Sequence, residues 1–319
     1  MKKPRSVPAA IDFYLTSRRQ LGFALTQEGW LLGTLARHAR ESHHRGPLTA
    51  ELVLRWAQLP RPADPLWWAR RLAIARQFAQ FWVAFDPRTQ VPPPGVFGPS
   101  HRRRPVHIYT QAQIAALLGA TASLGSADGD GMRVATFKTL FGLLACTGLR
   151  ISEALNLRPQ DFDATGQTLL IQPAKFSPAR RLPLQTSASV VLNQYDQFCQ
   201  QTLAQATRPA FFLNGYGRPL TRNYAEAVFA QVRAQLGWTQ DPVPRLHDLR
   251  HTFAVRCLVG WNRQAGGVDA KILALATYLG HRRVTDTYWY LSAIPQLLAS
   301  SAARFEQLAH STPEVQSHA

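Results

Sequence analysis

The sequence predicts a mainly α-helical protein built from a helical N-terminal domain and a mostly helical C-terminal domain that carries a small antiparallel β-sheet. The chain has 319 residues and 46% of them are apolar, which is enough to bury a core in each of two domains. Apolar residues recur at helical spacing through most of the chain. The clearest exception is residues 168–185, where two short β-prone runs surround a turn.

The first domain is expected over residues 1–90 and should be all-helical. Apolar residues at helical spacing mark residues 10–25, 30–39 and 67–85 as helices. A shorter helix should begin after Thr49, whose hydroxyl can cap its first turn.

A basic linker is expected over residues 91–109. Its prolines and glycines leave no period that would sustain a helix, and it contains the run Arg102, Arg103 and Arg104. A solvated connector would explain this composition, and so would a cationic strap that wraps around a polyanion.

The second domain is expected over residues 110–308, and residues 309–319 should form a flexible tail. Thr110 is placed to cap a helix, and another helix should run from Met132 to Thr147.

The rest of the second domain holds the β-prone segments. In the predicted hairpin of residues 168–185 a Phe-Ser-Pro turn places Lys175 at the tip. Residues 210–213 could add a strand, and a helix over residues 224–236 should end at Gly237.

The charge balance points to a polyanionic partner. The chain has 36 Lys and Arg against 19 Asp and Glu, a formal charge of +17. Residues 1–106 hold 17 basic and 6 acidic residues, which leaves them with the larger share of the excess. The N-terminal third should therefore be the stronger electrostatic footprint for a polyanion, although an arginine-rich composition could also reflect solubility or genomic bias.

Several classes of protein are disfavoured by what the sequence lacks. It has no run of eighteen apolar residues, and its N-terminus meets charge at Asp12, so we expect neither a membrane span nor a secretory signal and place the chain in the cytoplasm. Cys146, Cys199 and Cys257 are odd in number and widely spaced, which predicts buried, inert thiols rather than disulfides or a metal knuckle.

Titratable and cationic side chains concentrate near expected element ends. In ACTGLRISEALNL, Gly148 can end a helix, and Arg150 and Glu153 lie three residues apart at the start of the next, within pairing reach. Glu153 could orient Arg150 or be a solvated helix charge.

A second such segment is PRLHDLRHTFAVR. His247 and Arg250 lie three residues apart and should share a helical face, which would rotate His251 away into the packing of the helix, together with Cys257.

The last of these segments is LGHRRVTDTYWYL, which follows the hairpin tip and the His-Arg segment along the chain. It carries His281 and two candidate tyrosines, Tyr288 and Tyr290. At about 100° per helical residue the two tyrosines point roughly 200° apart, so only one of them can face a site.

These three segments and the hairpin tip with Lys175, in their order and spacing along the chain, resemble the catalytic half of the tyrosine recombinase, or phage integrase, family over roughly residues 110–308. The motifs are TGLRISEAL, a lysine in a β-hairpin before an R-x-x-P-L-like run, HDLRHTFA, and LGH followed by tyrosine. The resemblance implies an active site of Arg150, Lys175, His247, Arg250, His281 and a tyrosine. The family spaces its nucleophile nine residues after the LGH histidine, which indicates Tyr290.

The chemistry of DNA strand exchange suits these residue types. Arg150 and Arg250 could stabilise the extra negative charge of a phosphodiester under attack without a metal. Tyrosine can form a phosphotyrosine whose bond energy is returned to a new 5′-hydroxyl. Lys175 could protonate the leaving 5′-oxygen, and His247 and His281 could bind the phosphate or handle the tyrosine proton.

The resemblance further implies site-specific DNA breakage and rejoining through a 3′-phosphotyrosyl intermediate, with no cofactor. The implied partners are double-stranded DNA, a tetrameric synapse of recombinase protomers, and other recombinases. One alternative is a non-catalytic accessory DNA-binding protein, which would have no need of Tyr290. A relaxing topoisomerase is another, and the helical first domain weighs against it.

Two further sets of residues complete the expected site. The additional DNA contacts are expected at Arg102, Arg103, Arg104, Arg282 and Arg283. A metal cluster of His247, His251 and His281 is disfavoured, because no Cys or carboxylate completes a ligand set and nearby arginines would repel a cation.

Overall fold

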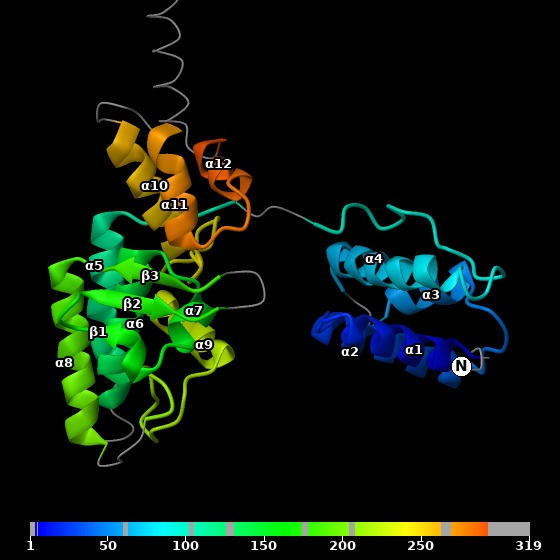
Figure 1. The fold of residues 1–319 in the computed structure, drawn as a ribbon, viewed down its shortest axis with the longest axis horizontal. Coiled ribbons are helices and arrows are strands. Elements are labelled where there is room, and N and C mark those ends of the chain that lie inside the picture. The colour runs from blue at the N-terminus through cyan, green and yellow to red at the C-terminus, as the bar shows by residue number, and fades with distance from the viewer. Residues whose placement is uncertain are drawn as a thin grey trace, which may run out of the picture. The chain divides into compact units, whose positions relative to one another are not determined.

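The computed structural model describes residues 4, 6–59, 63–101, 105–125, 131–173, 178–203, 208–262 and 269–292. The chain forms two compact units, residues 1–104 and 105–319. Each unit has its own hydrophobic core, and Figure 1 shows that both consist mainly of helices, with one small sheet in the second unit.

The N-terminal unit contains four helices around one core. They are α1 (Val7–Gln20), α2 (Thr26–Glu41), α3 (Ala50–Ala57) and α4 (Pro65–Trp82). Thr49 caps α3 as predicted, since its hydroxyl accepts a hydrogen bond from the Leu52 N–H at 3.2 Å. The first helix ends earlier than predicted, because Gly22 takes a φ of +85° and turns the chain.

The C-terminal unit has three short strands among its helices. The helices are α5 (Gln111–Ala120), α6 (Met132–Thr147), α7 (Ile151–Leu155), α8 (Thr186–Thr202), α9 (Arg222–Gln235), α10 (Asp248–Asn262), α11 (Asp269–Leu279) and α12 (Thr285–Ser292), with 3₁₀ turns η1 (Thr121–Leu124) and η2 (Pro159–Asp161). Thr110 caps α5 and α6 has the predicted bounds.

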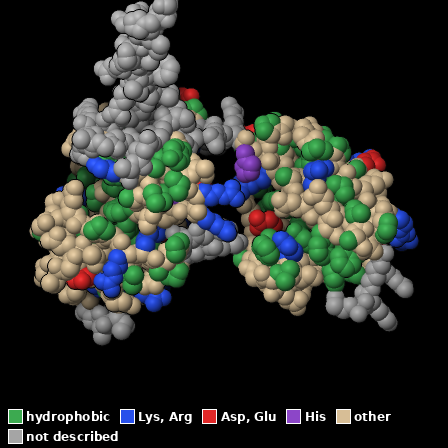
Figure 2. Space-filling model, turned by 45° about the horizontal axis from the view of Figure 1, so that its top comes forward, with side chains coloured by type: hydrophobic (Ala, Val, Ile, Leu, Met, Phe, Trp, Pro, Cys, Tyr) green, Lys and Arg blue, Asp and Glu red, His purple; other side chains and the backbone are tan. Residues whose placement is uncertain are grey.

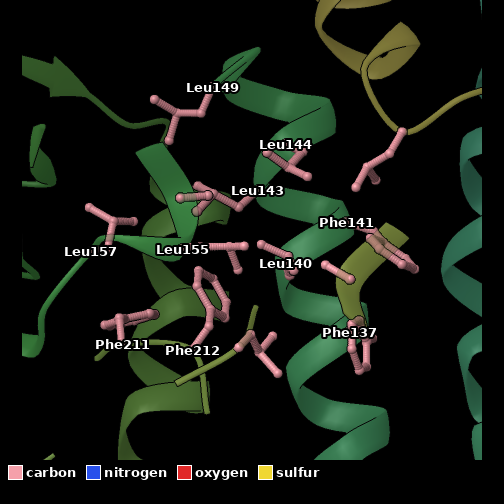
Figure 3. Packing of buried hydrophobic residues seen from close by; sticks show 14 of the residues in the cluster. Phe137, Leu140, Phe141, Leu143, Leu144, Leu149, Leu155, Leu157, Phe211 and Phe212 are labelled. Carbon is pink, nitrogen blue, oxygen red and sulfur yellow. The ribbon is translucent and has the colours of Figure 1, made fainter. Parts of the chain in front are cut away.

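Helix α6 runs through the larger core of this unit. Its side chains Leu140 and Leu143 are buried and extend toward Leu155 of α7, while Phe211 and Phe212 close the same core (Figure 3). The packing fixes the end of α6 relative to the start of α7.

The predicted hairpin is confirmed as part of a three-stranded antiparallel sheet. The strands β1 (Phe162–Asp163), β2 (Thr168–Ile171) and β3 (Arg180–Pro183) pair in that order. Leu169 and Leu182 face each other in the register and are fully buried. The tip of the hairpin, with Lys175, lies outside the described residues.

The strand predicted at residues 210–213 is wrong. Only an isolated bridge joins Leu213 to Pro219 there. The backbone of this segment forms hydrogen bonds with residues of the core and not with a neighbouring β-strand. The Phe211 N–H donates to the Leu157 carbonyl at 2.7 Å, and the Thr136 hydroxyl donates to the Leu213 carbonyl at 3.0 Å.

Both described ends of the expected linker are attached to the units they join. Val91 and Phe97 pack against the N-terminal core. Tyr109 is buried in the second unit, where its hydroxyl donates to the Arg245 carbonyl at 2.9 Å and its N–H donates to the Thr252 hydroxyl at 2.9 Å. The linker is thus held at α10 and is not a freely solvated chain there.

A smaller cluster holds α10, α11 and α12 together at one end of the second unit (Figure 1). It contains Val255, Leu258, Leu275, Leu279 and Tyr290. No helix among the described residues is long and apolar enough to cross a membrane.

Candidate active site

The end of α6 is shaped by one glycine. Gly148 has a φ of +63°, and its N–H donates to the Leu144 carbonyl at 3.0 Å. A Cβ at this position would lie 2.6 Å from Cδ1 of Phe253. Glycine therefore permits both the left-handed turn and the close approach of α10, and the chain leaves the turn with Arg150 at the N-cap of α7.

Arg150 and Glu153 form the pair that their spacing predicted. The Arg150 Nη1 donates to Glu153 Oε1 at 3.0 Å, and the Arg150 backbone N–H donates to Oε2 at 2.9 Å. The Arg150 side chain remains 34% exposed, whereas that of Glu153 is 4% exposed. Glu153 thus holds Arg150 from the buried side and leaves part of the guanidinium accessible.

A third group in this cluster was missed by the sequence analysis. Arg180, the first residue of β3, donates from Nη1 to Oε1 and from Nη2 to Oε2 of Glu153, each at 3.0 Å. Its Nε also donates to the Tyr278 carbonyl at 2.8 Å. The sequence signal for Arg180 was the R-x-x-P-L-like run that follows the hairpin tip, and this motif does not indicate which residue Arg180 would contact.

Arg250 lies deepest in the site. It is 2% exposed, and its Nη1 and Nη2 donate to the carbonyls of Gly148 and Leu279, each at 2.8 Å. Burial and the charge of Arg150 lower the pKa of Arg250 to about 10, so the guanidinium remains charged at neutral pH. Arg150 Nη2 donates to the next carbonyl, that of Gly280, at 3.1 Å.

His281 follows directly after this helix end. Its Nδ1 lies 2.7 Å from the Thr287 hydroxyl, a contact that the sequence analysis missed. Burial, followed by the charges of Arg250 and Arg150, lowers the pKa of His281 to about 4. The imidazole is therefore neutral at neutral pH.

The two tyrosines of α12 have different surroundings, as their spacing predicted. Tyr290 is 3% exposed and Tyr288 is 46% exposed. The Tyr290 ring stacks on that of His281 with centroids 6.1 Å apart, and its hydroxyl accepts a hydrogen bond from Arg250. Burial raises the pKa of Tyr290 while Arg250 opposes that rise.

The prediction for His251 is wrong. Its ring lies 4.8 Å from that of His247 and 5.5 Å from that of Tyr290, so it faces the site. His251 lies four positions after His247, and this spacing returns to the same helical face. Burial lowers the pKa of His251 to about 4. His247 is exposed at the surface.

The other predicted residues are at the surface or outside the described part of the chain. Arg282 and Arg283 are exposed directly after His281. Figure 2 shows basic side chains outnumbering acidic ones on the face that it draws. Lys175 and the run Arg102, Arg103 and Arg104 lie outside the described residues.

The structure also shows the exposure of the cysteines and the grouping of possible metal ligands. Cys199 is buried as predicted and Cys257 is partly buried, but Cys146 is exposed near the end of α6, so the prediction of a buried thiol is wrong there. Among the described residues, no three His, Cys, Asp or Glu side chains are grouped so that they could hold a metal ion.

The sequence of this chain is similar to those of known proteins. The model of the phage integrase family matches residues 108–296. The protein y4rB of Sinorhizobium fredii, an integrase/recombinase by name, is 36% identical over 305 residues, covering 93% of this chain and 96% of its own. The tyrosine recombinase XerD of Mycobacterium leprae is 32% identical over 233 residues, covering 72% of this chain and 67% of its own. The chain therefore belongs to the tyrosine recombinase, or phage integrase, family.

Solved structures share the fold at low sequence identity. The Tn1549 transposon integrase in complex with transposon right end DNA matches with a TM-score of 0.69 and 16% identity, covering 95% of this chain and 99% of that one. A lambda integrase dimer bound to a COC′ core site matches with a TM-score of 0.62 and 13% identity, covering 89% and 77%. The predicted fold class is confirmed.

Proposed function

We propose that the chain is a site-specific DNA recombinase that cleaves and rejoins DNA strands through a 3′-phosphotyrosyl intermediate on Tyr290. The observation that carries this proposal is the hydrogen bond between the Tyr290 hydroxyl and Arg250, in a site that also contains Arg150 and His281. Membership of the tyrosine recombinase family supports the same activity.

In the proposed reaction the Tyr290 oxygen attacks the scissile phosphorus. The bond from phosphorus to the tyrosine oxygen forms, and the bond to the 5′-oxygen breaks. Attack by a 5′-hydroxyl reverses these steps and rejoins the strand, so the reaction needs no external energy source. Arg150 and Arg250 stabilise the added charge on the non-bridging oxygens, because fixed guanidinium donors need not reorganise during the reaction.

Proton transfer is assigned to the remaining residues. The proton of Tyr290 passes to a neutral histidine, and the stacking of the His281 ring on that of Tyr290 supports His281 as this acceptor. His247 contacts the scissile phosphate from the solvent side. Lys175 protonates the departing 5′-oxygen as general acid. No cofactor takes part in these steps.

The partner of this site is double-stranded DNA. The excess of basic residues supplies the non-specific part of the binding, and the exposed Arg282 and Arg283 lie next to the catalytic histidine. Arg102, Arg103 and Arg104 add phosphate contacts from the linker. Strand exchange requires a tetrameric synapse of protomers on two DNA sites, which other recombinases could join.

The test compares variants of the two tyrosines of α12 on a DNA site that the protein itself selects. The wild-type chain first selects a duplex from a random-sequence pool, and a nick is then placed beside the cleavage position. The short fragment that ends in the 5′-hydroxyl diffuses away, so a denaturing gel retains the covalent adduct. Wild type and Tyr288→Phe should form the adduct, and Tyr290→Phe should bind the duplex without forming it.

Other outcomes would favour other functions. An adduct that persists in Tyr290→Phe would assign the nucleophile elsewhere. Tight binding by wild type without any adduct would support the accessory DNA-binding alternative. Relaxation of supercoiled plasmid that lacks the selected site would support the topoisomerase alternative.

A further inference from the structure

The carboxylate of Glu153 is saturated with donors. It accepts four hydrogen bonds: two from Arg150, through Nη1 and the backbone N–H, and two from Arg180, through Nη1 and Nη2. Burial raises the pKa of Glu153, but the hydrogen bonds from Arg180 and Arg150 outweigh it and lower the pKa below the ordinary value. Glu153 is therefore an ionised carboxylate inside the protein.

Arg180 directs its donors inward. Two of its nitrogens bind Glu153, Nε binds the Tyr278 carbonyl at 2.8 Å, and Nη2 also lies 3.4 Å from the Leu279 carbonyl. Its side chain is 9% exposed, against 34% for Arg150. Arg180 is the inner and Arg150 the outer member of a pair of arginines bridged by one carboxylate.

This arrangement sets the charge that the outer arginine presents. A carboxylate paired with Arg150 alone would cancel its positive charge and weaken its attraction for a phosphate. With Arg180 present, the two guanidiniums and the carboxylate together carry one positive charge. Fixed charges of this kind act strongly in a site from which water is excluded.

Arg180 also connects three parts of the site. It lies at the start of β3, its carboxylate partner lies in α7, and its carbonyl partners end α11, which one residue separates from His281. A bidentate guanidinium–carboxylate pair restrains orientation as well as distance. Loss of Arg180 would therefore disturb the position of Arg150 and the end of α11 together.

We propose that Arg180 is a positioning residue of the active site. Arg180 neutralises Glu153, so that Arg150 retains its positive charge for the scissile phosphate. The inference rests on the proposed function and assigns to Arg180 a role that its sequence motif does not specify. Arg180 itself does not contact the DNA.

A charge-restoring double variant tests this role. Arg180→Gln should lower the single-turnover rate of adduct formation at saturating DNA by about 100-fold, comparable to the loss of one oxyanion donor, while the Kd for DNA changes only a few-fold. Adding Glu153→Gln restores the net charge beside Arg150 and should recover at least about 10-fold of that rate. A purely structural role predicts no such recovery, because the double variant has lost more native contacts. Arg181→Gln, an exposed neighbour in β3, is the matched control and should cleave like wild type.

The outcomes separate this inference from the proposed function. If wild type forms the Tyr290-dependent adduct but the double variant is no faster than Arg180→Gln, the inference is wrong and the function stands. If wild type forms no adduct, both are wrong. Should Arg180→Gln fail to melt cooperatively, Arg180→Lys decides: it keeps a charge beside Glu153 and should cleave within about 10-fold of wild type, and a loss as large as that of Arg150→Ala would overturn the proposal.

Discussion

Arg150 and Arg250 have the same side chain in different surroundings, and they should respond differently to removal. Either change to alanine should slow cleavage by about 10²–10³-fold, the cost of removing one donor to a developing charge. Arg250→Ala should also destabilise the fold, because the Gly148 carbonyl loses its donor, at about 1–3 kcal/mol for an acceptor left unsatisfied, and the Leu279 carbonyl keeps only the longer bonds from Arg180 and Arg150. Arg150→Ala should cost less stability, since water can reach its partly exposed position.

Urea denaturation and single-turnover cleavage measured on the same two variants check this difference. Equal losses of stability in Arg150→Ala and Arg250→Ala would contradict the distinction between an accessible and a buried arginine.

Residue-level prediction succeeded where the partners are close in sequence. The three-residue spacing of Arg150 and Glu153 predicted their contact, and the helical angle predicted that Tyr288 and Tyr290 would differ in exposure. Arg180 could not be assigned a partner, because Glu153 lies 27 residues before it in the sequence and the two meet only in the folded structure. The roles of these residues in catalysis remain predictions.

At the scale of one element, the turn after α6 depends on the absence of a Cβ. Gly148→Ala should lose more stability than a left-handed alanine alone, which costs about 1–2 kcal/mol, because its Cβ would overlap Phe253 and press on Leu279. Gly237→Ala is the matched control: its φ is +67°, and nothing lies within 4 Å of the added Cβ. Denaturant unfolding of the two variants gives the comparison, and equal losses would show that α10 can move away.

Helices α10 and α12 and the turn before α12 surround neutral histidines, which makes their stability depend on pH. The pKa of His251 and of His281 is about 4 in the fold, below the ordinary value of about 6.5. Between these values the unfolded chain binds more protons than the folded chain. Stability is therefore fully present above pH 6.5 and is lost as the pH falls toward 4.

Denaturant melts between pH 6.5 and 5 measure this dependence. The double variant His251→Gln/His281→Gln should show a shallower decline in unfolding free energy than wild type across that window. A decline of unchanged slope would mean that neither histidine is held neutral by the fold.

Elements were predictable where a cap or a period fixed them. Thr49 and Thr110 cap the helices that they were expected to cap, and the hairpin formed from its two β-prone runs. Residues 210–213 look like a strand by composition, yet they are placed by the core around Phe211 and Phe212, which no local pattern reveals. The two-residue strand β1 is too short to have a period at all.

For the whole molecule, the charge distribution makes a prediction about DNA affinity. The two units have separate cores, so the second should remain folded when residues 1–106 are deleted. The deletion removes 17 basic residues, and it should weaken DNA binding and flatten the dependence of log K on log salt, which reports the number of phosphates neutralised. Fluorescence anisotropy over a salt series measures the slope, and an unchanged slope would show that the N-terminal unit makes few phosphate contacts.

The carbonyl of Leu279 accepts hydrogen bonds from more than one arginine of the site, which limits how amino-acid replacement at position 279 can affect the site. Arg250 and Arg180 both donate to that one oxygen, which belongs to the main chain. No amino-acid replacement at the position removes a backbone carbonyl, so drift there can alter packing but cannot delete the acceptor. The guanidiniums are therefore bound to an acceptor that is present whatever side chain occupies position 279. The end of α11 should tolerate apolar replacements such as Leu279→Met, whereas replacement of the arginines should not be tolerated.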